Sequence, residues 1–90
     1  MIPENPNKTD YVELVIDKVL QRLEKNGYCS LFARECYSEE TAKKVAQMFA
    51  DKKYYVKMNY FLNGQMQMLV VSKSPIRLSG ARMIDEVVYR

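Results

Sequence analysis

Two cysteines are the most reactive side chains in this sequence, and their spacing limits the chemistry that they could perform. Cys29 and Cys36 fall within residues 28–36, whose alternating pattern predicts one β-strand. On a continuous strand, at about 3.3 Å per residue, the two positions lie about 23 Å apart. A disulfide requires Cα atoms within roughly 7 Å of each other, so no bridge within the chain is expected. We therefore predict two buried free thiols, as is common for unpaired cysteines.

Other residues that could support catalysis are scarce. The sequence contains no histidine, which removes the base of Ser-His and Cys-His sites and leaves too few ligands for a zinc site. Gly27, Gly64 and Gly80 stand singly, so there is no glycine-rich phosphate-binding loop. Asp85 and Glu86 are adjacent, and adjacent residues of a helix do not face each other. We expect a protein that is not an enzyme and that uses no cofactor and no metal ion.

Length and composition indicate one domain of residues 1–90 with a mild positive charge. The chain is 48% hydrophobic and 28% charged, which is ordinary for a globular protein. No apolar run approaches the ~18–20 residues that span a bilayer, and the amino terminus lacks a signal-peptide pattern. A cytoplasmic location is expected, in the host cytoplasm if the protein is viral. Such a small chain without catalytic groups is typical of accessory or regulatory proteins, including those of phages.

Two amphipathic helices are predicted in the first part of the chain. The first follows an irregular arm of residues 1–9, has Asp10 as N-cap with Glu13 completing a capping box, and stops at Asn26-Gly27. The second begins at Ser38 as N-cap. Their apolar stripes and the strand residues facing them predict a core made of Val15, Val19, Leu31, Val45, Phe49, Met58, Leu69 and Val71.

A β-hairpin is predicted around Asn63-Gly64, which lies between the apolar-rich runs 54–62 and 65–74. Asn-Gly tolerates the two positive φ angles of a type I′ turn, which would pair Leu62 with Gln65. That register pairs the further residues Phe61–Met66, Tyr60–Gln67, Asn59–Met68, Met58–Leu69 and Val56–Val71. One hairpin face then carries Val56, Met58, Tyr60, Leu62, Leu69 and Val71, and the other carries Tyr55, Lys57, Asn59, Phe61, Met66, Met68 and Val70.

The order of elements predicts the fold class α+β, as a two-layer α/β sandwich of order α-β-α-β-β. If the last hairpin strand inserts between the two strands joined by the second helix, the sheet is mainly antiparallel and both helices pack on one of its faces. The tail, residues 75–90, is ambiguous. Met83, Ile84, Val87 and Val88 have helical spacing after Ser79 as a possible cap, but residues 86–89 could equally extend as an edge strand.

The sheet face without helices is the candidate binding site. It is expected to display eight residues: Phe32, Arg34, Tyr55, Lys57, Asn59, Phe61, Met66 and Met68. Exposed aromatic and methionine side chains favour contact with a partner protein, most simply a second copy of the chain, and exchange of the tail between the two copies is one way to build such a dimer. Alternatively, the aromatic rings stack on single-stranded RNA or DNA while Arg34 and Lys57 meet phosphates. In a third interpretation the tail folds over the face, with Ile76, Leu78, Met83, Ile84 and Val87.

Overall fold

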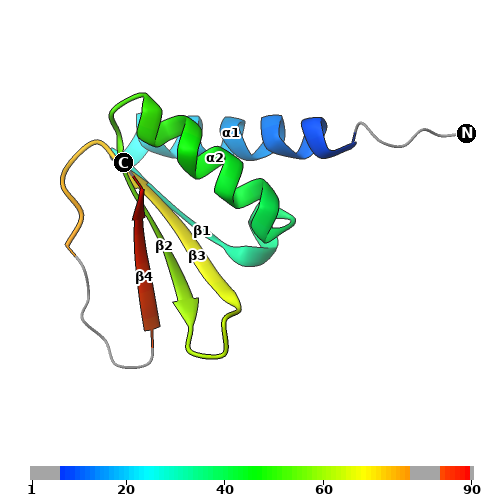
Figure 1. Ribbon diagram of the computed structural model, residues 1–90. Helices are drawn as coiled ribbons and strands as arrows, with labels where there is room; N and C mark the ends of the chain where they lie inside the picture. The colour runs from blue at the N-terminus through cyan, green and yellow to red at the C-terminus, as the bar shows by residue number, and fades with distance from the viewer. Residues whose placement is uncertain (1–6, 78–83, 90) are drawn as a thin grey trace, which may run out of the picture.

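The computed structural model describes residues 7–77 and 84–89, and in it two helices cover one face of a four-stranded sheet (Figure 1). The elements are α1 (Asn7–Asn26), β1 (Tyr28–Phe32), the short 3₁₀ helix η1 (Ala33–Cys36), α2 (Glu39–Asp51), β2 (Tyr55–Phe61), β3 (Met66–Ser72) and β4 (Ile84–Tyr89). The strand order is β1-β3-β2-β4, and all neighbours are antiparallel. The expected fold class, including the insertion of β3 between β1 and β2, is therefore confirmed.

Helix α1 begins at Asn7, three residues before the expected N-cap Asp10. No proline or glycine separates Asn7 from Asp10, so nothing in the backbone prevents the helix from starting earlier. Its inner face is set by Val15, Val19 and Leu23, which are all buried. At its end, Gly27 takes a positive φ of 83° and its N–H donates to the Leu23 carbonyl at 2.8 Å, which terminates the helix as predicted.

Strand β1 is shorter than expected because the chain turns into η1 after Phe32. The Glu35 carboxylate stabilises this turn by accepting a hydrogen bond from the Phe32 N–H at 3.2 Å. Cys36 therefore does not lie on the strand, and the continuous-strand geometry that we used for the cysteine pair is wrong. The turn instead carries Cys36 into the core, where both cysteines are buried and unbridged.

Helix α2 begins as expected, with the Ser38 hydroxyl accepting a hydrogen bond from the Thr41 N–H at 3.1 Å. The Tyr60 hydroxyl of β2 donates to the Glu39 carboxylate at 3.0 Å, which ties the helix start to the sheet. Burial and this hydrogen bond raise the pKa of Tyr60 to about 12. All eight expected core residues lie in one buried hydrophobic cluster between the helices and the sheet.

The hairpin has a different turn from the expected type I′. Gly64 has a φ of +91°, but Asn63 does not have a positive φ. The Gly64 N–H donates to the Phe61 carbonyl, and the Phe61 N–H donates to the Gln65 carbonyl, both at 2.9 Å. These bonds define a three-residue loop, a type I turn followed by glycine in the left-handed region.

A bulge on β3 restores the expected register away from this turn. Tyr60 pairs with Met66, whereas Asn59 pairs with Met68, so Gln67 is the extra residue. The pairs Asn59–Met68, Met58–Leu69 and Val56–Val71 are as predicted. The pairs Leu62–Gln65, Phe61–Met66 and Tyr60–Gln67 are wrong, because the longer loop shifts the register by one residue until the bulge compensates. Leu62 is consequently exposed in the loop rather than part of the core face.

The tail forms an edge strand rather than a helix between residues 84 and 89. Strand β4 pairs along β2 from Val56–Tyr89 to Phe61–Ile84. Leu78, Ser79 and Met83, which entered our alternatives for the tail, lie outside the described residues.

Candidate functional site

The sheet face opposite the helices, here called the outer face, contains most of the predicted site residues. The strand registers align its side chains in rows across the sheet. One row contains Tyr28, Ser72 and Tyr55, the next contains Ser30, Val70, Lys57 and Val88, and a third contains Phe32, Met68, Asn59 and Glu86. Phe61 and Ile84 follow at the hairpin end. Six of the eight predicted residues are thus brought onto one sheet surface; the exceptions are Met66 and Arg34, which lies in η1 beyond the end of β1 rather than on a strand.

Met66 belongs to the core, not to the outer face. It pairs with Tyr60 and is buried in the hydrophobic cluster beneath the helices. The reason is the bulge at Gln67, because a one-residue shift in a strand reverses the direction of the side chains beyond it. The prediction of Met66 as an exposed side chain of the outer face is therefore wrong, although the 8% of the residue that is exposed helps to line a hollow beside Phe32 and Phe61.

Lys57 is not available as an exposed cation. Only 8% of the residue is exposed, and its ammonium group lies 2.6 Å from the Glu86 carboxylate of β4. It also donates to the Arg77 carbonyl at 3.2 Å. The ion pair sits in the middle of the outer face, so the charge that we expected to contact phosphate is neutralised within the protein.

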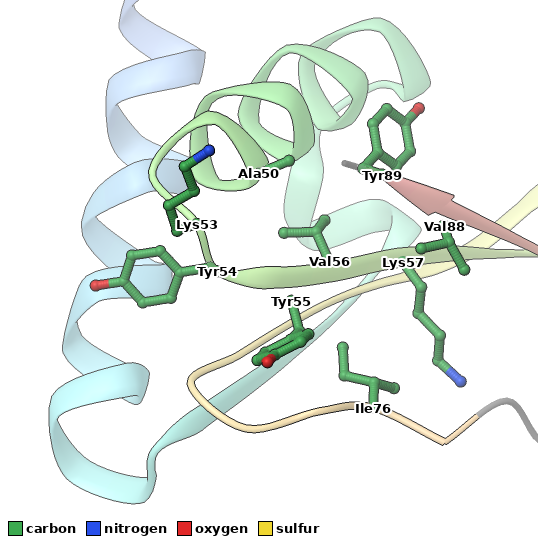
Figure 2. A pocket seen from close by; sticks show the side chains of 9 residues that line it. All are labelled: Ala50, Lys53, Tyr54, Tyr55, Val56, Lys57, Ile76, Val88 and Tyr89. Atoms are coloured by element: carbon green, nitrogen blue, oxygen red, sulfur yellow. The ribbon is translucent and has the colours of Figure 1, made fainter.

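Residues 73–77 explain much of this burial, because they run across the outer face. Strands β3 and β4 are parallel to each other and lie on either side of β2, so their connection must cross β2. A right-handed crossover is strongly preferred. Since β3 runs opposite to β1, a right-handed connection from β3 must cross the face opposite the one crossed by α2. Ile76 lies beneath β2 on the side of Tyr55 and Lys57, away from α2 (Figure 2). Ile76 thus covers this part of the face, as the third interpretation expected, whereas Ile84 and Val87, which it also placed over the face, extend the sheet as β4.

A hollow of about 430 Å³ lies where β4 ends beside β2. Figure 2 shows Ala50, Val56 and Tyr89 on the helix side of β2, and Tyr55, Lys57 and Ile76 on the outer side. Lys53, Tyr54 and Val88 complete the lining. Of these residues, the sequence had pointed only to Tyr55 and Lys57 as site residues. The position of Ile76 could have been predicted from the preference for a right-handed crossover between β3 and β4.

The hairpin end of the outer face is open and hydrophobic. Phe32 and Phe61, which are 51% and 42% exposed, flank a shallow hollow of about 340 Å³ together with Ala33, Arg34, Met66 and Gln67. Met68 lies between them on β3 and is half-buried. We call Phe32, Arg34, Phe61 and Met68 the Phe32–Phe61 surface.

Two buried side-chain oxygens near this surface accept no hydrogen bond from the described residues. They are Asn59 Oδ1 and Gln67 Oε1, and Asn59 as a residue is only 7% exposed. Both atoms carry partial negative charge, so their electric field opposes the approach of an anion to this surface.

The described residues contain little that could perform a reaction. They include no group of three His, Cys, Asp or Glu side chains that could hold a metal ion. Burial raises the pKa of Cys29 and of Cys36 to about 11, which makes each thiol a poor nucleophile at neutral pH. Nor does the described part of the chain contain a helix long and apolar enough to cross a membrane.

Comparisons of this chain with protein-family models, with curated proteins and with solved structures gave no match.

Proposed function

We propose that this chain is a small non-catalytic binding protein that recognises a partner protein through the Phe32–Phe61 surface. The observation that supports this proposal is the exposure of Phe32 and Phe61, which are 51% and 42% exposed and line the same hollow at the hairpin end of the outer face. Two half-exposed phenylalanines flanking a hollow are suited to take up apolar side chains of another protein. Arg34 at the rim suits an acidic or carbonyl group beside them.

The alternative function is binding of single-stranded RNA or DNA on the same surface. The exposed rings of Phe32 and Phe61 support it, since aromatic rings at a sheet surface stack on bases. The charge distribution is less favourable. Lys57 is paired with Glu86, so Arg34 is the cation that remains among the eight predicted residues, and Asn59 and Gln67 place acceptor oxygens nearby. Phosphate contacts supply most nucleic-acid affinity, so we rank protein binding first.

Selection of binding peptides from a random display library on the immobilised protein provides a test. A selected peptide should shift the amide NMR signals of Phe32, Phe61 and Met68, and its affinity should fall about tenfold or more in the double variant Phe32→Glu/Phe61→Glu, because each buried phenylalanine contributes ~1.5–3 kcal/mol. The matched control is Tyr28→Glu/Tyr55→Glu, which places the same charges at the opposite end of the same face and should retain binding.

The result that supports the nucleic-acid alternative is equally specific. A single-stranded homopolymer of deoxythymidine or uridine would bind with an affinity that decreases with salt, and Arg34→Ala would weaken that binding. If the selected peptides bind the Tyr28/Tyr55 control as weakly as they bind the Phe32/Phe61 variant, the proposed binding surface is wrong.

A further inference from the structure

The two edges of the sheet differ, because side chains occupy two backbone groups on the free edge of β1. The Gly27 carbonyl accepts from the Lys73 N–H, so the backbone groups of Gly27, Cys29 and Leu31 face β3 and those of Tyr28, Ser30 and Phe32 face outward. The outward Ser30 carbonyl accepts from Arg22 Nη1 at 2.9 Å, and the outward Phe32 N–H donates to Glu35 at 3.2 Å.

Arg22 and Glu35 are also bound to each other, at 3.0 Å. Partial burial alone would raise the pKa of Glu35, but the Phe32 N–H and the charge of Arg22 outweigh it and lower that pKa. Glu35 is therefore ionised at neutral pH, and the two side chains hold each other over the strand edge. Blocked edges of this kind prevent another chain from pairing with the sheet.

Strand β4 forms the other edge, and no strand of the described chain lies beyond it. The Phe61 N–H donates to Gln65, so Phe61 faces β3 and the alternate residues Val56, Met58 and Tyr60 face β4. Their partners Tyr89, Val87 and Asp85 therefore bond to β2, which directs the amides of Ile84 and Val88 away from the sheet.

The side chains of β4 do not protect this edge. Val87 and Val88 are each 45% exposed, one on either face of the sheet. The strand contains no lysine and no proline, which are the residues that commonly keep edge strands apart. An edge of this composition is a template for pairing with another strand.

We infer that the protein forms a symmetric homodimer in which β4 pairs antiparallel with β4 of a second copy. The charges of β4 favour a second copy of the chain as the partner strand at this edge. Centred on Val87, the pairing places Val87 beside its own counterpart and Asp85 opposite Tyr89, so no like charges face each other. Glu86, the other acidic residue of the strand, is already paired with Lys57 inside each copy.

This arrangement joins two four-stranded sheets into one sheet of eight strands. The twofold axis is perpendicular to the sheet, so both outer faces remain on the same side. The dimer would thus present two Phe32–Phe61 surfaces to a partner at once. The inference does not depend on the proposed function, because it rests on the two edges and not on the Phe32–Phe61 surface.

Proline substitution tests the inference with a matched control. The Val88 amide faces away from β2, so Val88→Pro removes a donor from the open edge and leaves the β2–β4 ladder intact. Ser30→Pro makes the same change at an outward position of the blocked edge. Sedimentation equilibrium should give twice the single-chain mass for wild type and Ser30→Pro, and the single-chain mass for Val88→Pro with unchanged circular dichroism.

A single-chain mass for the wild type, or a dimer that survives in Val88→Pro, would overturn the inference. Amide hydrogen exchange in the wild type keeps the test decisive if Val88→Pro fails to fold. The amides of Glu86 and Val88, which lie opposite each other in this register, should become more protected as the protein concentration rises, whereas protection that is independent of concentration contradicts the dimer. A dimer that dissociates in Phe32→Glu/Phe61→Glu but not in Val88→Pro would place the contact on the outer face instead.

Discussion

At the scale of single residues, the buried Lys57–Glu86 ion pair is the main electrostatic feature of the outer face. The side chains are 10% and 7% exposed, so water screens neither charge well. Taking two charges out of water is costly, and their attraction compensates only while both are present. The pair therefore contributes to the choice of β4 as the neighbour of β2, since correct pairing satisfies both charges.

Removal of one member of this pair should be strongly destabilising. Lys57→Met removes the ammonium group that lies 2.6 Å from the buried Glu86 carboxylate and should lower the free energy of unfolding by about 3–5 kcal/mol, measured by urea denaturation. The control is Lys43→Met, which removes the exposed Lys43–Glu39 pair and should change stability by about 0.5 kcal/mol or less. The double variant Lys57→Met/Glu86→Leu should recover part of the loss. Equal effects of Lys57→Met and Lys43→Met would refute this role of the buried pair.

The two cysteines lead to a pH dependence of stability. Both thiols are buried, and burial raises the pKa of each from 9.0 to about 11. Below pH 9 the folded and unfolded chains are both protonated at these groups, so the contribution to stability is fully present. As the pH rises from 9 towards 11, the unfolded chain loses protons that the folded chain retains, and the contribution is lost.

Stability should therefore fall between pH 9 and pH 10 by about 1 kcal/mol for each thiol. Urea denaturation at both pH values should show a smaller decrease for Cys29→Ala/Cys36→Ala than for the wild type, because the other groups titrate alike in the two proteins. Thiol titration after unfolding without reductant should find two free thiols per chain. An interchain disulfide in freshly purified protein would show that these thiols are accessible in the folded chain.

At the scale of elements, the hairpin loop depends on one backbone conformation. Gly64 has a φ of +91°, and a Cβ added there would meet no atom within 4 Å. A side chain at this position therefore lowers stability through the strained backbone conformation and not through contacts with neighbouring atoms. Gly64→Ala should destabilise the protein by about 1–2 kcal/mol, and Gly64→Asn by less, because asparagine tolerates the left-handed region. Denaturant unfolding of both variants measures the difference, and equal costs would be inconsistent with this explanation.

Phe49 is the largest of the buried side chains on helix α2. The residue is 2% exposed and packs edge-on against Tyr54, with 5.4 Å between ring centroids. Phe49→Ala should cost about 3–5 kcal/mol through lost burial and the cavity that remains. Because a domain of this size has only ~5–15 kcal/mol of stability, the variant should be close to unfolding at room temperature. An effect below about 1 kcal/mol would mean that the cavity collapses without loss of packing.

At the scale of the whole molecule, the blocked β1 edge limits how many copies can join. Arg22→Ala/Glu35→Ala removes the groups that occupy the Ser30 carbonyl and the Phe32 N–H. With both sheet edges open, the chain should form assemblies larger than a dimer as its concentration rises, detectable by light scattering. The control is Lys43→Ala/Glu39→Gln, which removes an exposed ion pair away from the edge, keeps an oxygen that can accept from the Tyr60 hydroxyl, and should leave the mass unchanged. If the Arg22/Glu35 variant also keeps the wild-type mass, these side chains do not prevent another strand from pairing with β1.

Local patterns in the sequence determined the two helices, the strands of the hairpin and the core. The helical spacing of Val15, Val19, Val45 and Phe49 and the cap at Ser38 act within a few residues, so they can be recognised without the rest of the chain. The alternation of Met58, Leu69 and Val71 similarly identified the sheet side that meets the helices.

The tertiary structure alone decided which face residues are exposed. Met66 entered the core through a bulge that offsets a longer turn, and Lys57 was buried by Glu86 and residues 73–77, distant from it in sequence. Cys36 reached the core through a turn held by Glu35 and Arg22 from another helix. Each outcome depends on partners far along the chain, and periodicity carries no information about such contacts.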